Sequence, residues 1–200
     1  MPRSPAPSAA RPAAPHEVRL IGGQWRRTRL PVADKPGLRP TPDRVRETLF
    51  NWLGQDLTGW RCVDAFAGSG ALGLEAASRG AAEVLLVERD TQLVAGLREV
   101  LARLRADAVA RVQRGDGVAA LERWPAGTLD LVLLDPPFDA AGLFAPALAA
   151  AARAVRPGGW VYLEAPAVWD EAALAPLSLA PHRHLKAGAV HAQLLRRASA

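Results

Sequence analysis

The pattern that most constrains the fold of this chain begins at Arg61, where short apolar runs alternate with Ala-rich and Leu-rich stretches. The runs have strand length and the stretches have helical spacing, which is typical of βα units in a mostly parallel sheet. Five strands are predicted, at Cys62 to Phe66, Val84 to Val87, Ala110 to Gln113, Leu129 to Leu134 and Trp160 to Glu164. The helices predicted between them are Ala71 to Arg79, Thr91 to Arg105, Gly117 to Trp124 and Gly142 to Val155, with a turn at Pro157 to Gly159. The alternation therefore predicts a doubly wound α/β sheet.

The chain beyond Glu164 carries a weaker pattern. A short helix is predicted near Trp169 to Leu174, followed by strands at Leu177 to Leu185 and Ala189 to Arg196. The tight turn at Lys186 to Gly188 would join these strands as an antiparallel hairpin at the edge of the sheet.

The amino-terminal part has a different composition. Met1 to Pro15 consists almost wholly of Pro, Ala, Ser and Arg, which cannot bury enough apolar surface to become ordered, so we expect a disordered tail. The pattern from Val18 to Leu30 predicts a basic β-hairpin. Thr41 is predicted to cap an amphipathic helix from Pro42 to Leu53, because a threonine before a proline favours a helix start.

Chain length sets the expected domain count. With 200 residues, of which 50% are hydrophobic, the chain can bury one substantial core. We expect one α/β domain with a tail over residues 1–15, a basic hairpin and helix over residues 16–56, and the main sheet over residues 57–200. A monomer is expected.

Charge and cysteine content limit the partners and the compartment. The net charge of +5, from 25 Lys and Arg against 20 Asp and Glu, favours an anionic partner where the excess is localised. Cys62 is the only cysteine, so no intrachain disulfide can form, and we expect a reducing, cytoplasmic setting. No stretch approaches the roughly 18 apolar residues of a membrane helix, and the first residues lack the apolar centre of a secretory signal. We expect no membrane partner.

A glycine-rich loop follows the first predicted strand and fits the spacing G-x-G-x-x-G at Gly68, Gly70 and Gly73. Glycines allow a sharp turn and a close approach to a ligand, which suits a dinucleotide pyrophosphate or an amino-acid moiety equally well. Asp64 separates these two interpretations, because its carboxylate would repel a pyrophosphate and attract the amino group and sulfonium of S-adenosylmethionine. The alternative is a packing turn with no ligand. The residues assigned to this cofactor loop are Asp64, Phe66, Gly68, Ser69 and Gly70.

Two further acids stand at predicted strand ends. Glu88 ends the second strand, where its carboxylate can accept both hydroxyls of a ribose. Asp116 follows the third strand and can accept the amino group of adenine. An exposed strand-end acid is the alternative for Glu88, and a helix cap is the alternative for Asp116.

The fourth strand ends in an Asp-Pro-Pro-Phe turn, formed by Asp135, Pro136, Pro137 and Phe138. The amino nitrogen of a base donates its lone pair into the ring and is a poor nucleophile. The Asp135 carboxylate and a backbone carbonyl of the turn can accept its two N–H bonds, which favours a pyramidal nitrogen aimed at a methyl carbon. The prolines fix the backbone and remove competing N–H donors, and Phe138 offers a face for stacking a base. The alternative is a turn that only ends the strand.

The glycine loop, Glu88 and this turn together resemble class I S-adenosylmethionine-dependent methyltransferases that modify exocyclic amines. Ile21-Gly22-Gly23 and the segment from Arg39 to Leu53 resemble, more specifically, the bacterial 16S ribosomal RNA guanine-N2 methyltransferases that act on guanine 966. The likeness runs from about Val18 to Leu195.

The resemblance implies a seven-stranded sheet and S-adenosylmethionine as cofactor, with methionine binding by Asp64 to Gly70 and ribose binding by Glu88. It implies target-amine binding by Asp135 to Phe138, and 16S ribosomal RNA or the small ribosomal subunit as the substrate. Gly117 departs from the family pattern, where alanine is commoner after the acid, and this puts the adenine-binding role of Asp116 in doubt.

The positive charge is concentrated between His16 and Arg46, where eight basic residues stand against three acids. Such a hairpin can follow a phosphate backbone and would bind RNA in a salt-dependent manner, although charge runs are also common on plain solvated surfaces. Arg39 and Thr41 could instead close over the cofactor or hold the base. The predicted RNA-binding residues are Arg19, Trp25, Arg26, Arg27, Arg29, Arg39, Thr41 and Arg44.

Other functions remain open from the sequence. Adenine-N6 or cytosine-N4 methylation of DNA would use the same turn, the literal glycine spacing fits a nicotinamide oxidoreductase, and a catalytically silent RNA-binding factor could retain the fold. His182 and His184 alternate along one strand without a third ligand, so no metal site is predicted.

Overall fold

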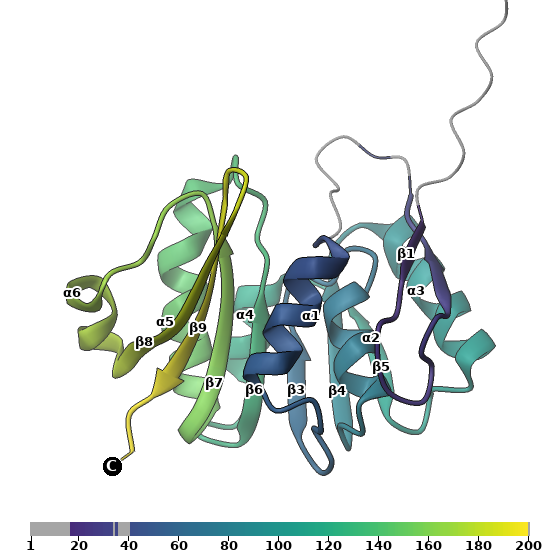
Figure 1. Cartoon of the computed structure of the whole chain (residues 1–200), viewed down its shortest axis with the longest axis horizontal. Coiled ribbons are helices and arrows are strands. Elements are labelled where there is room, and N and C mark those ends of the chain that lie inside the picture. Colours follow the sequence, from purple (N-terminus) through teal and green to yellow (C-terminus); the bar gives the residue numbers. More distant parts are fainter. Residues whose placement is uncertain (1–16, 34, 36–40, 200) are drawn as a thin grey trace, which may run out of the picture.

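The computed structural model describes residues 17–33, 35 and 41–199. Seven strands form one sheet in the order β5-β4-β3-β6-β7-β9-β8, and β1 and β2 form a separate two-stranded ribbon (Figure 1). The first five strands along the chain in the large sheet pair in parallel, while β9 runs antiparallel to both of its neighbours. The doubly wound α/β sheet predicted from the sequence is confirmed. The strands are β1 Glu17–Arg19, β2 Arg29–Pro31, β3 Arg61–Asp64, β4 Glu83–Glu88, β5 Ala110–Arg114, β6 Leu129–Leu134, β7 Val155–Ala165, β8 Leu179–Ala187 and β9 Val190–Arg197.

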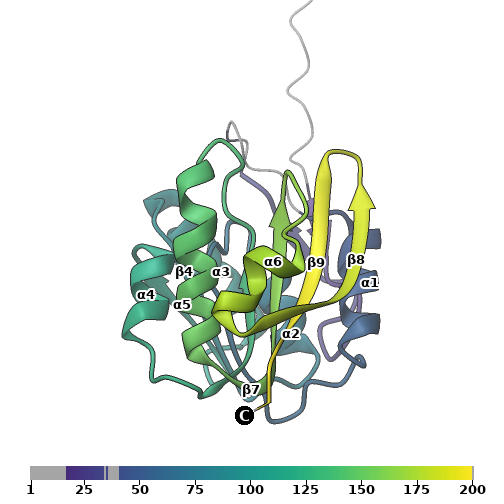
Figure 2. The ribbon, with the colours of Figure 1, turned by 90° about the vertical axis from the view of Figure 1, so that its left-hand side faces the viewer.

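Helices cover both faces of the sheet, because apolar side chains point to both sides of the parallel strands. One core lies between the sheet and α1, α2 and α3, and also takes in the β1–β2 ribbon; the other lies under α4, α5 and α6. Figure 2 shows α4 and α5 on the opposite side of the sheet from α1. The helices are α1 Asp43–Trp52, α2 Ala71–Ser78, α3 Thr91–Leu104, α4 Gly117–Arg123, α5 Phe144–Ala154 and α6 Glu171–Leu174, with 3-10 turns at Ala141–Leu143 and Ala175–Leu177. None of these helices of the described chain is long and apolar enough to cross a membrane.

The strand order reverses between β3 and β6, which places a switch point at their carboxyl ends. β3 ends in Asp64, and the residue after β6 is Asp135. The two acids singled out from the sequence therefore lie on adjacent parallel strands, beside the loops where open α/β sheets bind ligands.

Several element bounds differ from the prediction. Ala65 and Phe66 belong to the turn after β3, so the predicted first strand was two residues too long. β7 begins at Val155, so Pro157 to Gly159 lies inside the strand at a register shift instead of forming a turn before it. The carboxyl-terminal hairpin is confirmed; β9 pairs with β7, and β8 is the outer strand. The tail predicted for residues 1–15 lies outside the described residues.

The prediction that Thr41 caps α1 was wrong. Pro42 occupies the N-cap position, and no side chain caps the helix. The Thr41 hydroxyl instead donates a hydrogen bond to Glu164, at the end of β7, over a distance of 2.7 Å. Thr41 lies one residue before the N-cap position, and its hydroxyl makes a charge-assisted hydrogen bond to the buried carboxylate instead.

A buried carboxylate on α2 anchors the amino-terminal segment to the sheet. Glu75 has no exposed surface and accepts hydrogen bonds from the backbone N–H groups of Ile21, at 2.8 Å, and Gly22, at 2.7 Å. Its two oxygens also pair with Arg46 of α1, at 3.3 Å, and Arg79, at 2.9 Å. The ribbon and α1 are therefore held on the same core as the large sheet.

Candidate active site

The glycine loop connects β3 to α2 through residues 65–70. Gly68 and Gly70 have φ values of +52° and +79°, a region that favours glycine, so both serve the sharp turn. Gly73 has a packing role, because a Cβ there would clash with Leu86 and lie 3.0 Å from the Asp64 Cβ. The third glycine of the pattern therefore brings the first turn of α2 onto the end of the strand.

Asp64 supplies a buried carboxylate beneath this loop. The residue is 1% exposed, and its Oδ2 accepts the Gly73 N–H at 2.9 Å. Burial raises the pKa of Asp64 to about 7, although backbone hydrogen bonds from Gly73 and Phe66 oppose that rise. Its Oδ1 is buried and has no hydrogen-bond partner among the described residues. Buried polar atoms are almost always partnered, so this oxygen indicates a position for a donor or a cation from a ligand.

Glu88 and Asp116 each have a local structural role. Glu88 accepts the N–H of Gly68 at 3.0 Å and that of Asp90 at 2.9 Å, which fixes the glycine loop against the end of β4. Asp116 caps α4 by accepting the Ala119 N–H at 2.9 Å. Carboxylate oxygens can accept more than one hydrogen bond, so the proposed contacts to ribose and adenine stay predictions.

Gly117 has a packing role at the start of α4. A Cβ at this position would clash with the Ala65 carbonyl in the loop after β3. The first turn of α4 therefore approaches the glycine loop at a distance that only glycine allows. Gly117 therefore allows close packing beside the glycine loop, and Asp116 lies at the same edge of the sheet.

The Asp-Pro-Pro-Phe turn follows β6 at the switch point. Asp135 is half-buried and Pro136 is buried, whereas Pro137 and Phe138 are exposed. Phe138 is 36% exposed, one of the few large apolar side chains with that much free surface. Burial raises the pKa of Asp135 well above its usual range, and the nearby carboxylates of Glu164 and Asp64 raise it further. The turn thus places a carboxyl group near those of Asp64 and Glu164, with an exposed aromatic ring three residues later.

The structure adds Glu164 and Tyr162 to the site, and the sequence reasoning missed both. Glu164 is 3% exposed, and its Oε1 accepts the hydroxyls of Thr41 at 2.7 Å and of Tyr162 at 2.8 Å. Burial raises the pKa of Glu164, whereas these two hydrogen bonds lower it. The sequence did contain a signal for Glu164, because it is an acid at the end of an apolar predicted strand, as Asp64 and Asp135 are.

The predicted RNA-binding residues are distributed over the ribbon and α1. Arg19 forms an ion pair with Asp43, and Arg29 forms one with Glu17; the N–O distance is 2.8 Å in each pair. Trp25 is only partly exposed and packs against the core, so less of its ring is available for stacking. Thr41 is buried beside the carboxylates, and Arg39 lies outside the described residues. The exposed cations in this group are Arg19, Arg26, Arg27, Arg29 and Arg44.

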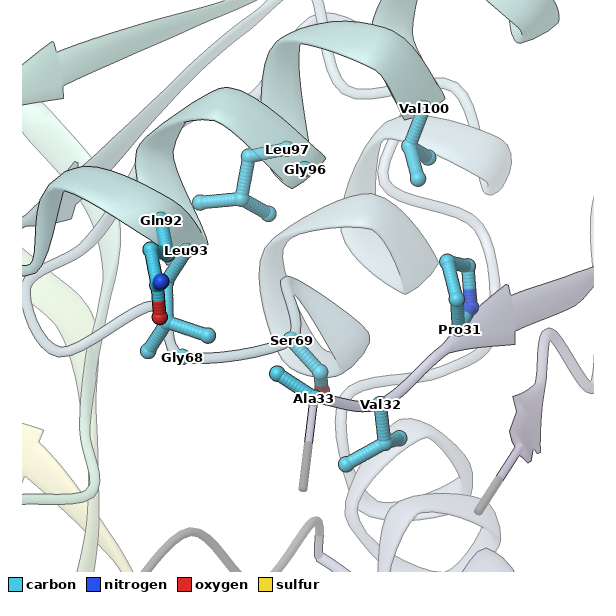
Figure 3. Close-up of a pocket in the computed structure, with 10 residues that line it drawn as sticks. All are labelled: Pro31, Val32, Ala33, Gly68, Ser69, Gln92, Leu93, Gly96, Leu97 and Val100. Atoms are coloured by element: carbon cyan, nitrogen blue, oxygen red, sulfur yellow. The ribbon is translucent and has the colours of Figure 1, made fainter. Parts of the chain in front are cut away.

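A small apolar pocket adjoins the glycine loop on the side of α3 (Figure 3). It lies between Pro31 to Ala33, at the end of β2 and just after it, and the α3 residues Leu93 and Leu97, and it has a volume of about 160 Å³. Ligand sites for drug-sized molecules are usually about 300–1,000 Å³. This pocket contains none of the carboxylates described above, so the chemistry is assigned to the carboxyl ends of the strands, where those carboxylates lie.

A family model described as Conserved hypothetical protein 95 matches residues 18–196. The chain belongs to this family. Among its relatives, Ribosomal RNA small subunit methyltransferase D of Escherichia coli (strain K12) is 52% identical over 123 residues, and the match covers 61% of each chain. The protein of the same name from Haemophilus influenzae is 43% identical over 129 residues, covering 64% of this chain and 67% of that one. The match thus spans about three fifths of the length of the Escherichia coli relative.

Solved structures extend the likeness over nearly the whole fold. The yhhF protein of Escherichia coli, which is named as a methyltransferase, superposes with a TM-score of 0.79 at 36% identity, covering 92% of this chain and 100% of that one. A methylase-named structure from Haemophilus influenzae gives a TM-score of 0.75 at 30% identity, with coverages of 92% and 100%. The sheet is of the class I methyltransferase type, and this fold and these relatives indicate S-adenosylmethionine as the methyl donor.

The residues of the crevice fit that cofactor. The unpartnered Asp64 Oδ1 is an acceptor for a cationic amino group, and the Gly68 to Gly70 turn leaves room for close backbone approach. Within the described residues, no group of three or more His, Cys, Asp and Glu side chains is arranged to hold a metal ion.

Proposed function

We propose that this protein transfers a methyl group from S-adenosylmethionine to the exocyclic N2 of a guanine in 16S ribosomal RNA of the small subunit, at position 966. The observation that carries the proposal is the placement of the Asp-Pro-Pro-Phe turn beside Asp64 at the switch point of a class I methyltransferase sheet. The names of the Escherichia coli and Haemophilus influenzae relatives support ribosomal RNA as the substrate class.

The cofactor, when bound, supplies an electrophilic methyl group on a sulfonium. Asp64 would hold its amino group and Glu88 its ribose hydroxyls, while Gly68 and Gly70 would allow the backbone to follow the methionine moiety. Asp116 stands at the adjacent strand end and is the candidate for the adenine amino group. These contacts would place the methyl group toward the end of β6, where Asp135 follows.

Asp135 would then act on the target amine. Its carboxylate accepts one amine N–H and a backbone carbonyl of the turn accepts the other, so the nitrogen lone pair leaves the ring plane and points at the methyl carbon. Phe138, exposed at the rim, would stack on a base that has left its helix, a contact worth about 1–3 kcal/mol in single-strand recognition. Positioning and exclusion of water provide most of the acceleration.

The exposed cations of the ribbon and α1 would contact the RNA backbone. Arg26, Arg27 and Arg44 are exposed, and the Glu75 anchor fixes the ribbon on the same core as the glycine loop. Cations held at a fixed distance from the crevice can orient a flexible RNA segment toward it. DNA amine methylation would use the same turn, so the choice of RNA depends on the relatives and on this surface.

The test is transfer of tritiated methyl from S-adenosylmethionine to small ribosomal subunits and to naked 16S RNA lacking the modification. The wild-type protein should label at least one of them, and Asp135→Ala should lower the rate by about 10²-fold or more, as loss of a positioning acceptor does. Equal rates for wild type and variant would refute the role of the turn. Labelling of DNA but not of ribosomal RNA would favour the alternative.

A further inference from the structure

Two carboxyl side chains lie next to each other at the end of the site. β6 and β7 pair in parallel, with Leu134 opposite Leu163, so Asp135 and Glu164 occupy the next positions on neighbouring strands. Neighbouring strands are about 4.8 Å apart. The Thr41 hydroxyl donates to Glu164 at 2.7 Å, and the charge of Glu164 acts on Asp135, as expected of neighbouring acids.

Glu164 is held more rigidly than a surface acid would be. It is 3% exposed, and its Oε1 accepts hydrogen bonds from both Thr41 and Tyr162. These two hydrogen bonds use part of the acceptor capacity of a carboxylate, which has about four lone-pair sites. The neighbouring Asp64 Oδ1 is also buried and without a partner in the described part of the chain. The crevice therefore offers unfilled acceptors to a ligand at more than one point.

The bases that carry an exocyclic amine differ in the ring atom beside it. In adenine and cytosine the ring nitrogen next to the amino group has no proton and is an acceptor. In guanine the N2 amine is next to N1–H, which is a donor. Two adjacent carboxylates can accept from N2–H and N1–H of guanine together, whereas the second carboxylate would face a lone pair in adenine or cytosine.

We propose that Glu164 determines the specificity of the site for guanine, by accepting the N1–H of the base while Asp135 accepts the N2 amine. This inference rests on the proposed function, because it assigns the base that the same site takes. Rejection of the other bases follows from an unpaired buried acceptor, which is a stronger discriminator than the loss of an apolar contact.

The experiment compares two bases and three proteins, which are the wild type, Glu164→Gln and a control variant. Small subunits are reconstituted with 16S RNA that carries either guanine or 2-aminopurine at position 966. 2-Aminopurine keeps the 2-amino group and has no proton on N1. Glu164→Gln is nearly isosteric, its amide oxygen can still accept from Thr41 and Tyr162, and its amide N–H can donate to the unprotonated N1. Glu171→Gln, on the exposed surface of α6, is the matched control.

The expected result is a change in preference and not only in rate. The wild-type protein and the Glu171→Gln control should prefer guanine over 2-aminopurine in kcat/KM by about 10²-fold or more, and Glu164→Gln should lower that ratio at least tenfold. Equal losses on both bases in Glu164→Gln would assign Glu164 a structural role and overturn the inference. Equal wild-type rates on both bases would also overturn it, whereas no methylation of the guanine-containing subunit would refute the proposed function itself.

Discussion

Arg46 of α1 and Glu75 of α2 form an ion pair in which neither side chain has any exposed surface, with 3.3 Å between Nη1 and Oε2. Glu75 also accepts the backbone N–H groups of Ile21 and Gly22, and Arg46 donates to the carbonyl oxygens of Thr41, at 3.1 Å, and Arg19, at 2.8 Å. One buried pair therefore connects the ribbon, the start of α1 and the helix that follows the glycine loop. The position of Thr41 beside the carboxylates depends on it.

Removal of Glu75 should strongly destabilise the protein. Glu75→Ala leaves the buried Arg46 guanidinium with Asp43 as its remaining carboxylate partner and removes the carboxylate partner of Arg79. Breaking a buried pair in this way costs about 3–5 kcal/mol in comparable cases. Urea unfolding measures the loss, and Glu83→Ala is the control because its partners Arg61 and Arg111 are substantially exposed. The control should lose about 1 kcal/mol or less. Similar losses for both variants would contradict the role given to Glu75.

Asp64→Asn should weaken cofactor binding. The neutral amide cannot attract a cationic amino group, so calorimetry should show S-adenosylmethionine binding to the wild type and at least about tenfold weaker binding to the variant. The raised pKa of Asp64, about 7, adds a pH dependence. Below pH 7 the carboxyl group becomes protonated and wild-type affinity should fall, whereas above pH 7 it should level off. Unchanged affinity in the variant would contradict the assignment.

The same substitution should stabilise the free protein. The folded-state pKa of Asp64 lies above its unfolded value, so the penalty for the buried charge is absent below about pH 4, grows as pH rises, and is complete above about pH 7. The free energy of unfolding gained by Asp64→Asn should be about 2–3 kcal/mol larger at pH 8 than at pH 5. Urea unfolding at the two pH values measures the difference. A gain that does not depend on pH would contradict a cost of burying the charged Asp64 carboxylate.

Phe138→Ala should weaken turnover without weakening the fold. The ring is 36% exposed, so its removal leaves the core intact, but it removes a stacking surface worth about 1–3 kcal/mol. That loss corresponds to a decrease in kcat/KM of roughly 5-fold to 150-fold. Phe138→Tyr retains the ring and should keep most of the activity. Equal activity of the alanine variant and the wild type would contradict the proposed stacking role of the Phe138 ring.

The double substitution Arg26→Ala and Arg27→Ala should reduce RNA binding and its salt dependence. Removing one phosphate contact lowers the slope of log affinity against log salt by about 1, so the slope should fall by about 2 when both arginines are replaced. Arg123→Ala, an exposed residue in the last turn of α4, is the control and should leave the slope unchanged. An unchanged slope in the double variant would show that these two arginines do not contact RNA phosphates and lie on an ordinary solvated surface.

Sequence patterns predicted the fold because its signals are local. Parallel strands such as β4 and β6 are apolar runs, and the longer helices are amphipathic or Ala-rich stretches, so order and type could be read from neighbouring residues. The glycine loop and the Asp-Pro-Pro-Phe turn are also local motifs, and the structure places Asp64 and Asp135 on adjacent strands.

Long-range contacts were beyond those patterns. Thr41 and Glu164 are 123 positions apart, and nothing near Thr41 indicates that its hydroxyl would leave the helix cap for a buried carboxylate. Glu75 looked like an ordinary residue of a helix, and its partners Ile21 and Gly22 lie more than 50 positions earlier. The roles of the buried polar residues therefore depend on tertiary contacts and could not be predicted from the sequence, whereas the helices and strands around them could be predicted from local periodicity.

Guanine-N2 methylation is tested most directly by nucleoside mass spectrometry of 16S ribosomal RNA, after incubation of unmodified small subunits with the protein and S-adenosylmethionine. The proposed function predicts one new N2-methylguanosine, located at position 966, formed about 10²-fold more slowly or slower still with the Asp135→Ala variant. Formation of N6-methyladenosine or N4-methylcytidine instead, or of no methylated nucleoside, would contradict it.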